Sequence, residues 1–146
     1  MAISQAMCTS FKKELLDGKH DFNSAGHTFK IALYSAGAAL SAGTTNFTTS
    51  GEVVGAGYSS GGIELTKVDP TISGTVGITN FGTATFTAVS ITARGGLIYN
   101  TTTDGTSSTT NAVAVLDFSS DQTAVAGNFV VSFPTADGTT AILRVE

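Results

Sequence analysis

The stretch that decides the fold is Ala112-Val113-Ala114-Val115-Leu116-Asp117-Phe118. It is apolar except for one aspartate, and a short continuous apolar run is typical of a strand that is buried on both faces. Farther along the chain, Phe129, Val131 and Phe133 alternate with other residues, as in a strand with one buried face. We therefore expect strands here, with Pro134 ending one and Asp137-Gly138 forming a turn before the last strand.

Earlier segments show similar β patterns, rich in β-branched and aromatic residues. They predict strands over residues 29–34, 63–68, 75–81, 84–93 and 95–99. Pro70 cannot donate a backbone hydrogen bond, so it marks a turn or a sheet edge. About seven or eight strands between residue 28 and residue 145, at a spacing of roughly 8–12 residues, predict an antiparallel β-sandwich.

The N-terminal segment has a different period. Ile3, Met7, Phe11 and Leu15 recur every four residues, which is typical of an amphipathic helix. We predict one α-helix from about residue 3 to residue 17, with Gly18 as its left-handed C-terminal residue. Its apolar stripe either covers the core of this chain or docks on another subunit, and covering the core is the commoner arrangement.

Length and composition define the class of protein. The chain has 146 residues, which predicts a single domain over residues 1–146. Only 12% of the residues are charged and the net charge is −4, with Lys12-Lys13 as the one adjacent basic pair, so we expect no nucleic-acid partner. There is no apolar stretch of about 18 residues and no signal-peptide pattern, so we expect synthesis in a cytoplasm and no membrane partner. Cys8 is the single cysteine and is expected to be buried.

Two histidines raise the possibility of a metal site. His20 and His27 lie seven residues apart and could share an ion with Asp17 or Asp21. No second cluster of ligands accompanies them, so the alternative is two solvated histidines in a connection, one of them near a helix end. We favour the alternative and expect no metal-binding residues and no cofactor.

A glycine-rich stretch, Gly55-Ala56-Gly57-Tyr58-Ser59-Ser60-Gly61, superficially resembles a phosphate-binding loop. Its Gly-x-Ser-x-Gly portion formally matches the nucleophile elbow of hydrolases, with Ser59 as the nucleophile. Both motifs require a helix directly afterwards, whereas residues 63–66 predict a strand. We therefore expect a glycine turn, no cofactor-binding residues and no catalytic residues here.

Other candidates have ordinary explanations. Asp117 is expected to bond to turn amides, and Arg94 either anchors a partner carboxylate or lies on a surface rim. Asn46 and Asn100 begin glycosylation triplets, which mean little without a secretory signal. Residues 101–111 are nearly all Thr, Ser, Asp and Gly, which predicts an exposed tip.

A family resemblance runs through nearly the whole chain. Residues 1–16, 29–34, 93–100, 112–118 and 131–134 occur in the same order as in a group of small virion proteins of tailed bacteriophages, and the chain resembles that group. The longer Thr/Ser-rich tip is a departure from its usual pattern. The resemblance implies a structural protein and brings no catalytic motif with it.

These observations together predict a protein that is not an enzyme. Our first hypothesis is a capsid decoration or cement protein that binds the major capsid protein of a phage head, as a small homo-oligomer in the virion. A tail, neck or fibre-attachment component is the first alternative. A carbohydrate-binding or adhesion module ranks third, because tryptophan is absent and the chain has only three tyrosines to stack on sugars.

Overall fold

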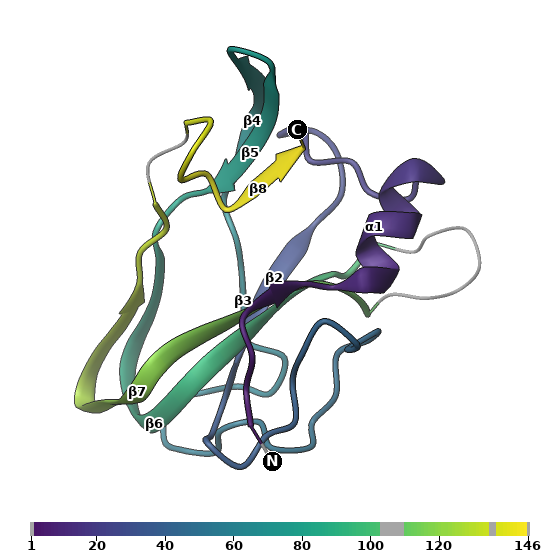
Figure 1. Cartoon of the computed structure of the whole chain (residues 1–146). Helices are drawn as coiled ribbons and strands as arrows, with labels where there is room; N and C mark the ends of the chain where they lie inside the picture. The colour runs from purple at the N-terminus through teal and green to yellow at the C-terminus, as the bar shows by residue number, and fades with distance from the viewer. Residues whose placement is uncertain (1, 103–109, 135–136, 146) are drawn as a thin grey trace.

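The computed structural model describes residues 2–102, 110–134 and 137–145, and it contains two antiparallel sheets and one helix (Figure 1). The larger sheet has the strand order β1-β7-β6-β2-β3, and the smaller sheet has the order β4-β5-β8. One cluster of buried apolar side chains includes residues of both sheets, such as Leu97 and Val115 of the larger and Phe81 and Leu143 of the smaller. The mainly β, sandwich-like architecture expected from the sequence is confirmed.

Two long strands form the framework of the larger sheet. β6 (Ala84–Asn100) and β7 (Asn111–Val131) pair with each other along their lengths, and Figure 1 shows the ribbon bending at its lower left. The sequence predicted two separate strands in each of these ranges. Register shifts along the ribbon, with positive φ at Ala88, Ser119 and Ala126, allow the chain to change direction without ending the ladder.

The other strands agree with the predicted segments to different extents. β2 (Phe29–Tyr34) has the predicted bounds, and β5 (Val76–Phe81) lies within its predicted range. The predicted strand over residues 63–68 is instead divided into β3 (Ile63–Glu64) and β4 (Lys67–Ser73), which belong to different sheets. Pro70 lies in β4, an edge strand with a register shift between Val68 and Thr71, so its predicted position at an edge is confirmed.

The N-terminal helix is shorter than predicted. α1 spans Thr9–Leu16, whereas β1 (Ala6–Met7) pairs with β7, and Ile3 forms a bridge with Leu40. The prediction of a helix from residue 3 was wrong because a spacing of four residues is also an even number. It therefore places side chains on one face of a strand as well as on one face of a helix.

The end of α1 is where the sequence predicted it. Gly18 has φ 73°, the Lys19 N–H donates to the Glu14 carbonyl at 3.0 Å, and the Gly18 N–H donates to the Leu15 carbonyl at 3.2 Å. These are the two hydrogen bonds of a Schellman motif. None of the helical structure in the described ranges is long and apolar enough to cross a lipid bilayer.

The predicted turn at Asp137 is present, but it does not join two strands that pair with each other. The Thr139 and Thr140 N–H groups both donate to Asp137 Oδ1, at 2.8 and 2.9 Å. The strand that follows, β8 (Leu143–Val145), pairs with β5 instead of with β7. The turn therefore carries the chain from the larger sheet to the smaller one.

Candidate functional site

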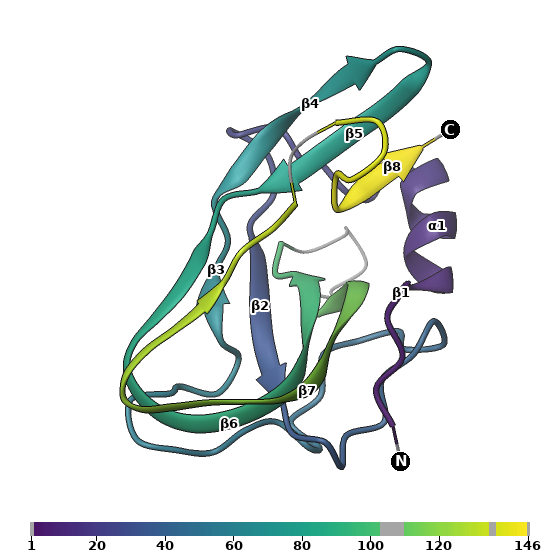
Figure 2. The ribbon, with the colours of Figure 1, turned by 60° about the vertical axis from the view of Figure 1, so that its left-hand side comes forward.

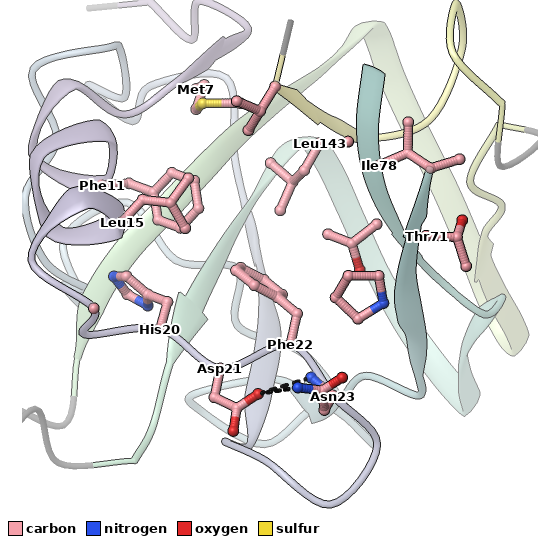
Figure 3. Close-up of a pocket in the computed structure, with 15 residues that line it drawn as sticks. Met7, Phe11, Leu15, His20, Asp21, Phe22, Asn23, Thr71, Ile78 and Leu143 are labelled. Carbon is pink, nitrogen blue, oxygen red and sulfur yellow. Dashed lines mark hydrogen bonds between the residues drawn. The ribbon is translucent and has the colours of Figure 1, made fainter. Parts of the chain in front are cut away.

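A groove of about 540 Å³ lies between α1 and β8, and we call it the α1–β8 groove. Figure 3 shows Phe11 and Leu15 of α1 on one side, Ile78 of β5 on the other, and Phe22 and Leu143 in the middle. These side chains come from four separate parts of the chain, and they make the lining predominantly apolar.

Phe22 anchors the floor of the groove. It belongs to the connection between α1 and β2, which contains neither helix nor strand. Its ring stacks on Phe29 with centroids 4.5 Å apart and meets Phe11 edge-on at 5.8 Å. Such aromatic pairs add roughly 0.5–1.5 kcal/mol each beyond the burial of their surface, so they hold this irregular segment on the core.

Large aliphatic side chains are exposed beside the groove. Val145 lines it and is 58% exposed. Ile72 of β4 and Val145 of β8 both lie opposite the lining residue Gly77 of β5, so their side chains share one face of the smaller sheet, and Ile72 is 81% exposed. Leu16, the last residue of α1, follows the lining residue Leu15 and is 90% exposed. A contiguous apolar patch on a surface marks an interaction site more often than scattered aliphatic residues do. The groove and these three side chains therefore form the best candidate for a binding surface.

The two histidines lie close together, but neither of the two expected roles describes them. Nδ1 of His20 and Nδ1 of His27 each lie 3.0 Å from the Asn100 Nδ2 amide. His20 Nε2 lies 3.2 Å from Glu14 Oε1, and its side chain has no exposed surface. The view of both histidines as solvated was therefore wrong for His20, because Asn100 and Glu14 satisfy both of its ring nitrogens inside the fold.

The aspartates considered as further ligands are engaged elsewhere. Asp17 forms an ion pair with Lys13 at 2.6 Å, and Asp21 Oδ1 accepts the backbone and side-chain N–H groups of Asn23. In residues 2–102, 110–134 and 137–145 there is no group of three or more His, Cys, Asp or Glu side chains that could hold a metal ion. The contacts of both histidines with Asn100, and of His20 with Glu14, instead hold α1 and the connection that follows it against the end of β6.

The glycine-rich loop is organised around a carboxylate of this chain. Glu52 Oε1 accepts the Tyr58 hydroxyl at 2.7 Å and the Gly61 N–H at 2.6 Å, and Glu52 Oε2 accepts the Ser60 hydroxyl at 2.8 Å. Three donors of the loop therefore already have an acceptor within this chain. The strand β3 follows the loop, as predicted, so Ser59 is not at a strand-to-helix elbow.

The predicted glycine turn has a steric basis. Gly62 has φ 77°, and a Cβ atom there would overlap the Ile31 carbonyl. The loop therefore lies directly against the backbone of β2, an approach that only glycine permits.

The other candidate residues that the structure describes interact within this chain or are buried in it. Asp117 Oδ1 accepts the Ser119 N–H at 2.8 Å, which is the predicted local role, although it lies within β7. Arg94 Nε contacts Asp121 Oδ1 of the same chain at 2.9 Å. Asn100 is buried, so it is no acceptor for glycosylation in the folded chain, and Asn46 donates to Thr110. In the predicted tip, residues 103–109 lie outside the described part of the chain.

The sequence patterns did not reveal the roles of the residues that organise the α1–β8 groove, the histidine contacts and the glycine-rich loop. Phe22 and Asn100 carry no periodic signal, and Glu52 is separated from the loop residues that it binds. The period-four stripe that contains Phe11 and Leu15 was the sequence feature that indicated one wall of the groove. Comparisons with protein-family models, with curated proteins and with solved structures gave no match.

Proposed function

We propose that this chain is a structural protein of a tailed-phage virion, without enzymatic activity, that decorates the head shell by binding the major capsid protein. The observation that supports this most directly is the exposed aliphatic rim of the α1–β8 groove, formed by Leu16, Ile72 and Val145. The proposal places the protein in the virion after synthesis in the host cytoplasm and includes assembly as a small homo-oligomer.

Burial of the rim provides the driving force for docking. Covering one large aliphatic side chain is worth roughly 1.5–3 kcal/mol, and association costs several kcal/mol in lost freedom of motion. Three such side chains therefore give weak attachment for a single copy. Many copies on a closed shell, linked to one another as oligomers, would add their contacts together by multivalency.

The low density of charge is compatible with this mode of binding. Lys13 and Asp17 lie close in sequence to the rim and already neutralise each other. Burial of surface near them requires little desolvation of unpaired ions, which is the usual penalty in a polar interface. The specificity of docking would then depend on shape and on a few polar contacts.

Carbohydrate binding is less well supported than docking on protein. Tyr34 and Tyr99 are buried, and their hydroxyls donate to the Thr48 and Gly61 carbonyls at 2.6 Å. The Tyr58 hydroxyl donates to Glu52. None of the three tyrosines presents the free, exposed ring that stacking on a sugar requires.

Quantitative mass spectrometry of purified virions from the phage that encodes this chain tests the proposal. We expect the chain at a copy number comparable with that of the major capsid protein. A few copies per particle would favour the neck or tail, and absence from the particle would contradict a structural role. Light scattering of the purified protein tests the homo-oligomer.

A further inference from the structure

The outer edge of β8 borders the α1–β8 groove. Within the described residues β8 has one strand neighbour, β5, and Figures 1 and 2 both show β8 between β5 and α1. In a strand, successive backbone groups point alternately to the two sides, so an edge strand presents unpaired N–H and C=O groups on its outer side. The groove therefore combines apolar walls with a backbone edge that can accept another strand.

The opposite edge of the same sheet is protected against such pairing. β4 contains Pro70, which has no N–H, and a register shift interrupts its ladder next to this residue. Lys67 and Asp69 add charges to that edge. Proline, irregularity and charge are the devices that proteins use to block edge-to-edge association. β8 is short and carries the charge of Arg144, but it has neither proline nor a register shift, so its backbone can pair where the ladder of β4 is interrupted.

The side chains of β8 indicate which sequence such a strand would carry. Leu143 and Val145 both line the groove, so Arg144, between them, points to the other face of the strand. Arg144 is exposed, and no carboxylate of the described residues pairs with it. A residue directly opposite Arg144 on an added strand would meet its guanidinium, and opposite charges at such positions attract.

We propose that an extended segment of the partner protein adds to β8 as a fourth strand of the smaller sheet. It places apolar residues beside Leu143 and Val145, within the groove, and an acidic residue opposite Arg144. This inference rests on the proposed function, because it names the segment of the capsid partner that the rim receives. A second copy of this chain is a less suitable partner than the capsid protein. If two copies of β8 paired about a two-fold axis at Arg144, the two arginines would lie opposite each other and repel.

Synthetic peptides test the recognition directly. The probe is an extended peptide of alternating Val and Thr with a central Glu. The matched control peptide has Lys in place of that Glu. We expect the Glu peptide to bind, with chemical-shift changes and slowed amide exchange at β8. We expect the Lys peptide to bind about fivefold more weakly, as a change of about 1 kcal/mol in one cross-strand pair implies. Arg144→Glu should reverse this preference, while Arg94→Glu, the same charge change on the β6–β7 ribbon, should leave it unchanged.

Four results would overturn the inference, and the last of them leaves the proposed function intact. The first is equal affinity for both peptides, or no binding of either. The second is full affinity for a Glu peptide whose alternate amides are N-methylated on the pairing side, since that peptide cannot form the ladder. The third is protection of β8 by self-association without peptide. If the protein decorates shells and Arg144→Glu does so equally well, strand addition fails while the proposed function remains.

Discussion

At the scale of single residues, two polar side chains order segments that have no regular structure. Glu52 accepts three hydrogen bonds from the loop that follows it, and Asn100 contacts both His20 and His27. Buried polar groups are costly when they lack partners and rigidify a fold when they are satisfied. These two residues therefore determine where the adjacent loops lie against the core.

Cys8 should be unreactive in the folded protein. Burial, and to a smaller extent the nearby Glu14 carboxylate, raise the pKa of its thiol from 9.0 to about 11, so the nucleophilic thiolate is rare at neutral pH. We expect slow labelling by iodoacetamide at pH 8 and fast labelling in denaturant, measured by mass spectrometry. Because the unfolded thiol ionises near pH 9, Cys8 stabilises the fold below that pH, and its contribution declines as the pH rises towards 11. Rapid labelling of the native protein would contradict this placement.

Asp137 gives the opposite dependence on pH. Hydrogen bonds from Thr139 and Thr140 lower the pKa of its carboxyl from 3.8 to about 2. Its ionised form therefore stabilises the turn above about pH 4, and that contribution is lost as the pH falls towards 2. We expect the carboxyl carbon signal in NMR to titrate near pH 2. We also expect Asp137→Ala to remove part of the acid dependence of unfolding, and a titration near pH 4 would refute the turn geometry.

At the scale of elements, the alternation of apolar residues was the most reliable signal. It predicted β2 with correct bounds, and residues 112–116 of the predicted apolar run are buried within β7. The positions where strands bend were not predictable, because bulges in the β6–β7 ribbon depend on a partner strand that is distant in sequence. The beginning of α1 was mispredicted for the related reason that β1 exists only because β7 lies beside it.

The loop before β3 provides a test at this scale. Glu52→Ala would leave the Ser60 hydroxyl, the Tyr58 hydroxyl and the Gly61 N–H without their acceptor. We expect this change to lower the free energy of unfolding by about 2–4 kcal/mol, measured by denaturant titration. Glu64→Ala is the control, because Glu64 is exposed and should change stability by less than about 0.5 kcal/mol. Equal effects of the two variants would show that Glu52 does not organise the loop.

At the scale of the whole molecule, the candidate site is formed by tertiary structure. α1, the connection that carries Phe22, β5 and β8 meet only in the folded chain, and together they enclose the α1–β8 groove (Figure 3). The sequence predicted apolar residues on α1 and on the last strand, and left open whether the helix stripe faces inward or outward. The stripe faces inward, because Phe11 is buried and Leu15 is partly buried against the core, whereas Leu16, outside the stripe, is exposed.

The exposed rim should contribute to docking without contributing to folding. The double variant Leu16→Ser, Ile72→Ser removes two aliphatic side chains that are already in contact with solvent. We expect the free energy of unfolding to change by less than about 1 kcal/mol. Binding to head shells should weaken at least about tenfold, because roughly 3 kcal/mol or more of burial is lost.

A matched control for this variant is available on another part of the surface. Val54 and Val125 are 95% and 80% exposed and lie together beside a shallow depression away from the α1–β8 groove. Val54→Ser, Val125→Ser should leave both stability and shell binding unchanged. Equal loss of shell binding in the two double variants would show that the rim of the groove has no special role.

The most direct test of the account is a cryo-EM map of the intact phage particle at a resolution that shows strands. We predict that this chain lies on the outer face of the head shell in a repeating pattern, with Leu16, Ile72 and Val145 covered by the capsid protein. A map in which the chain is absent, or in which it sits on the shell with this rim facing solvent, would contradict the account.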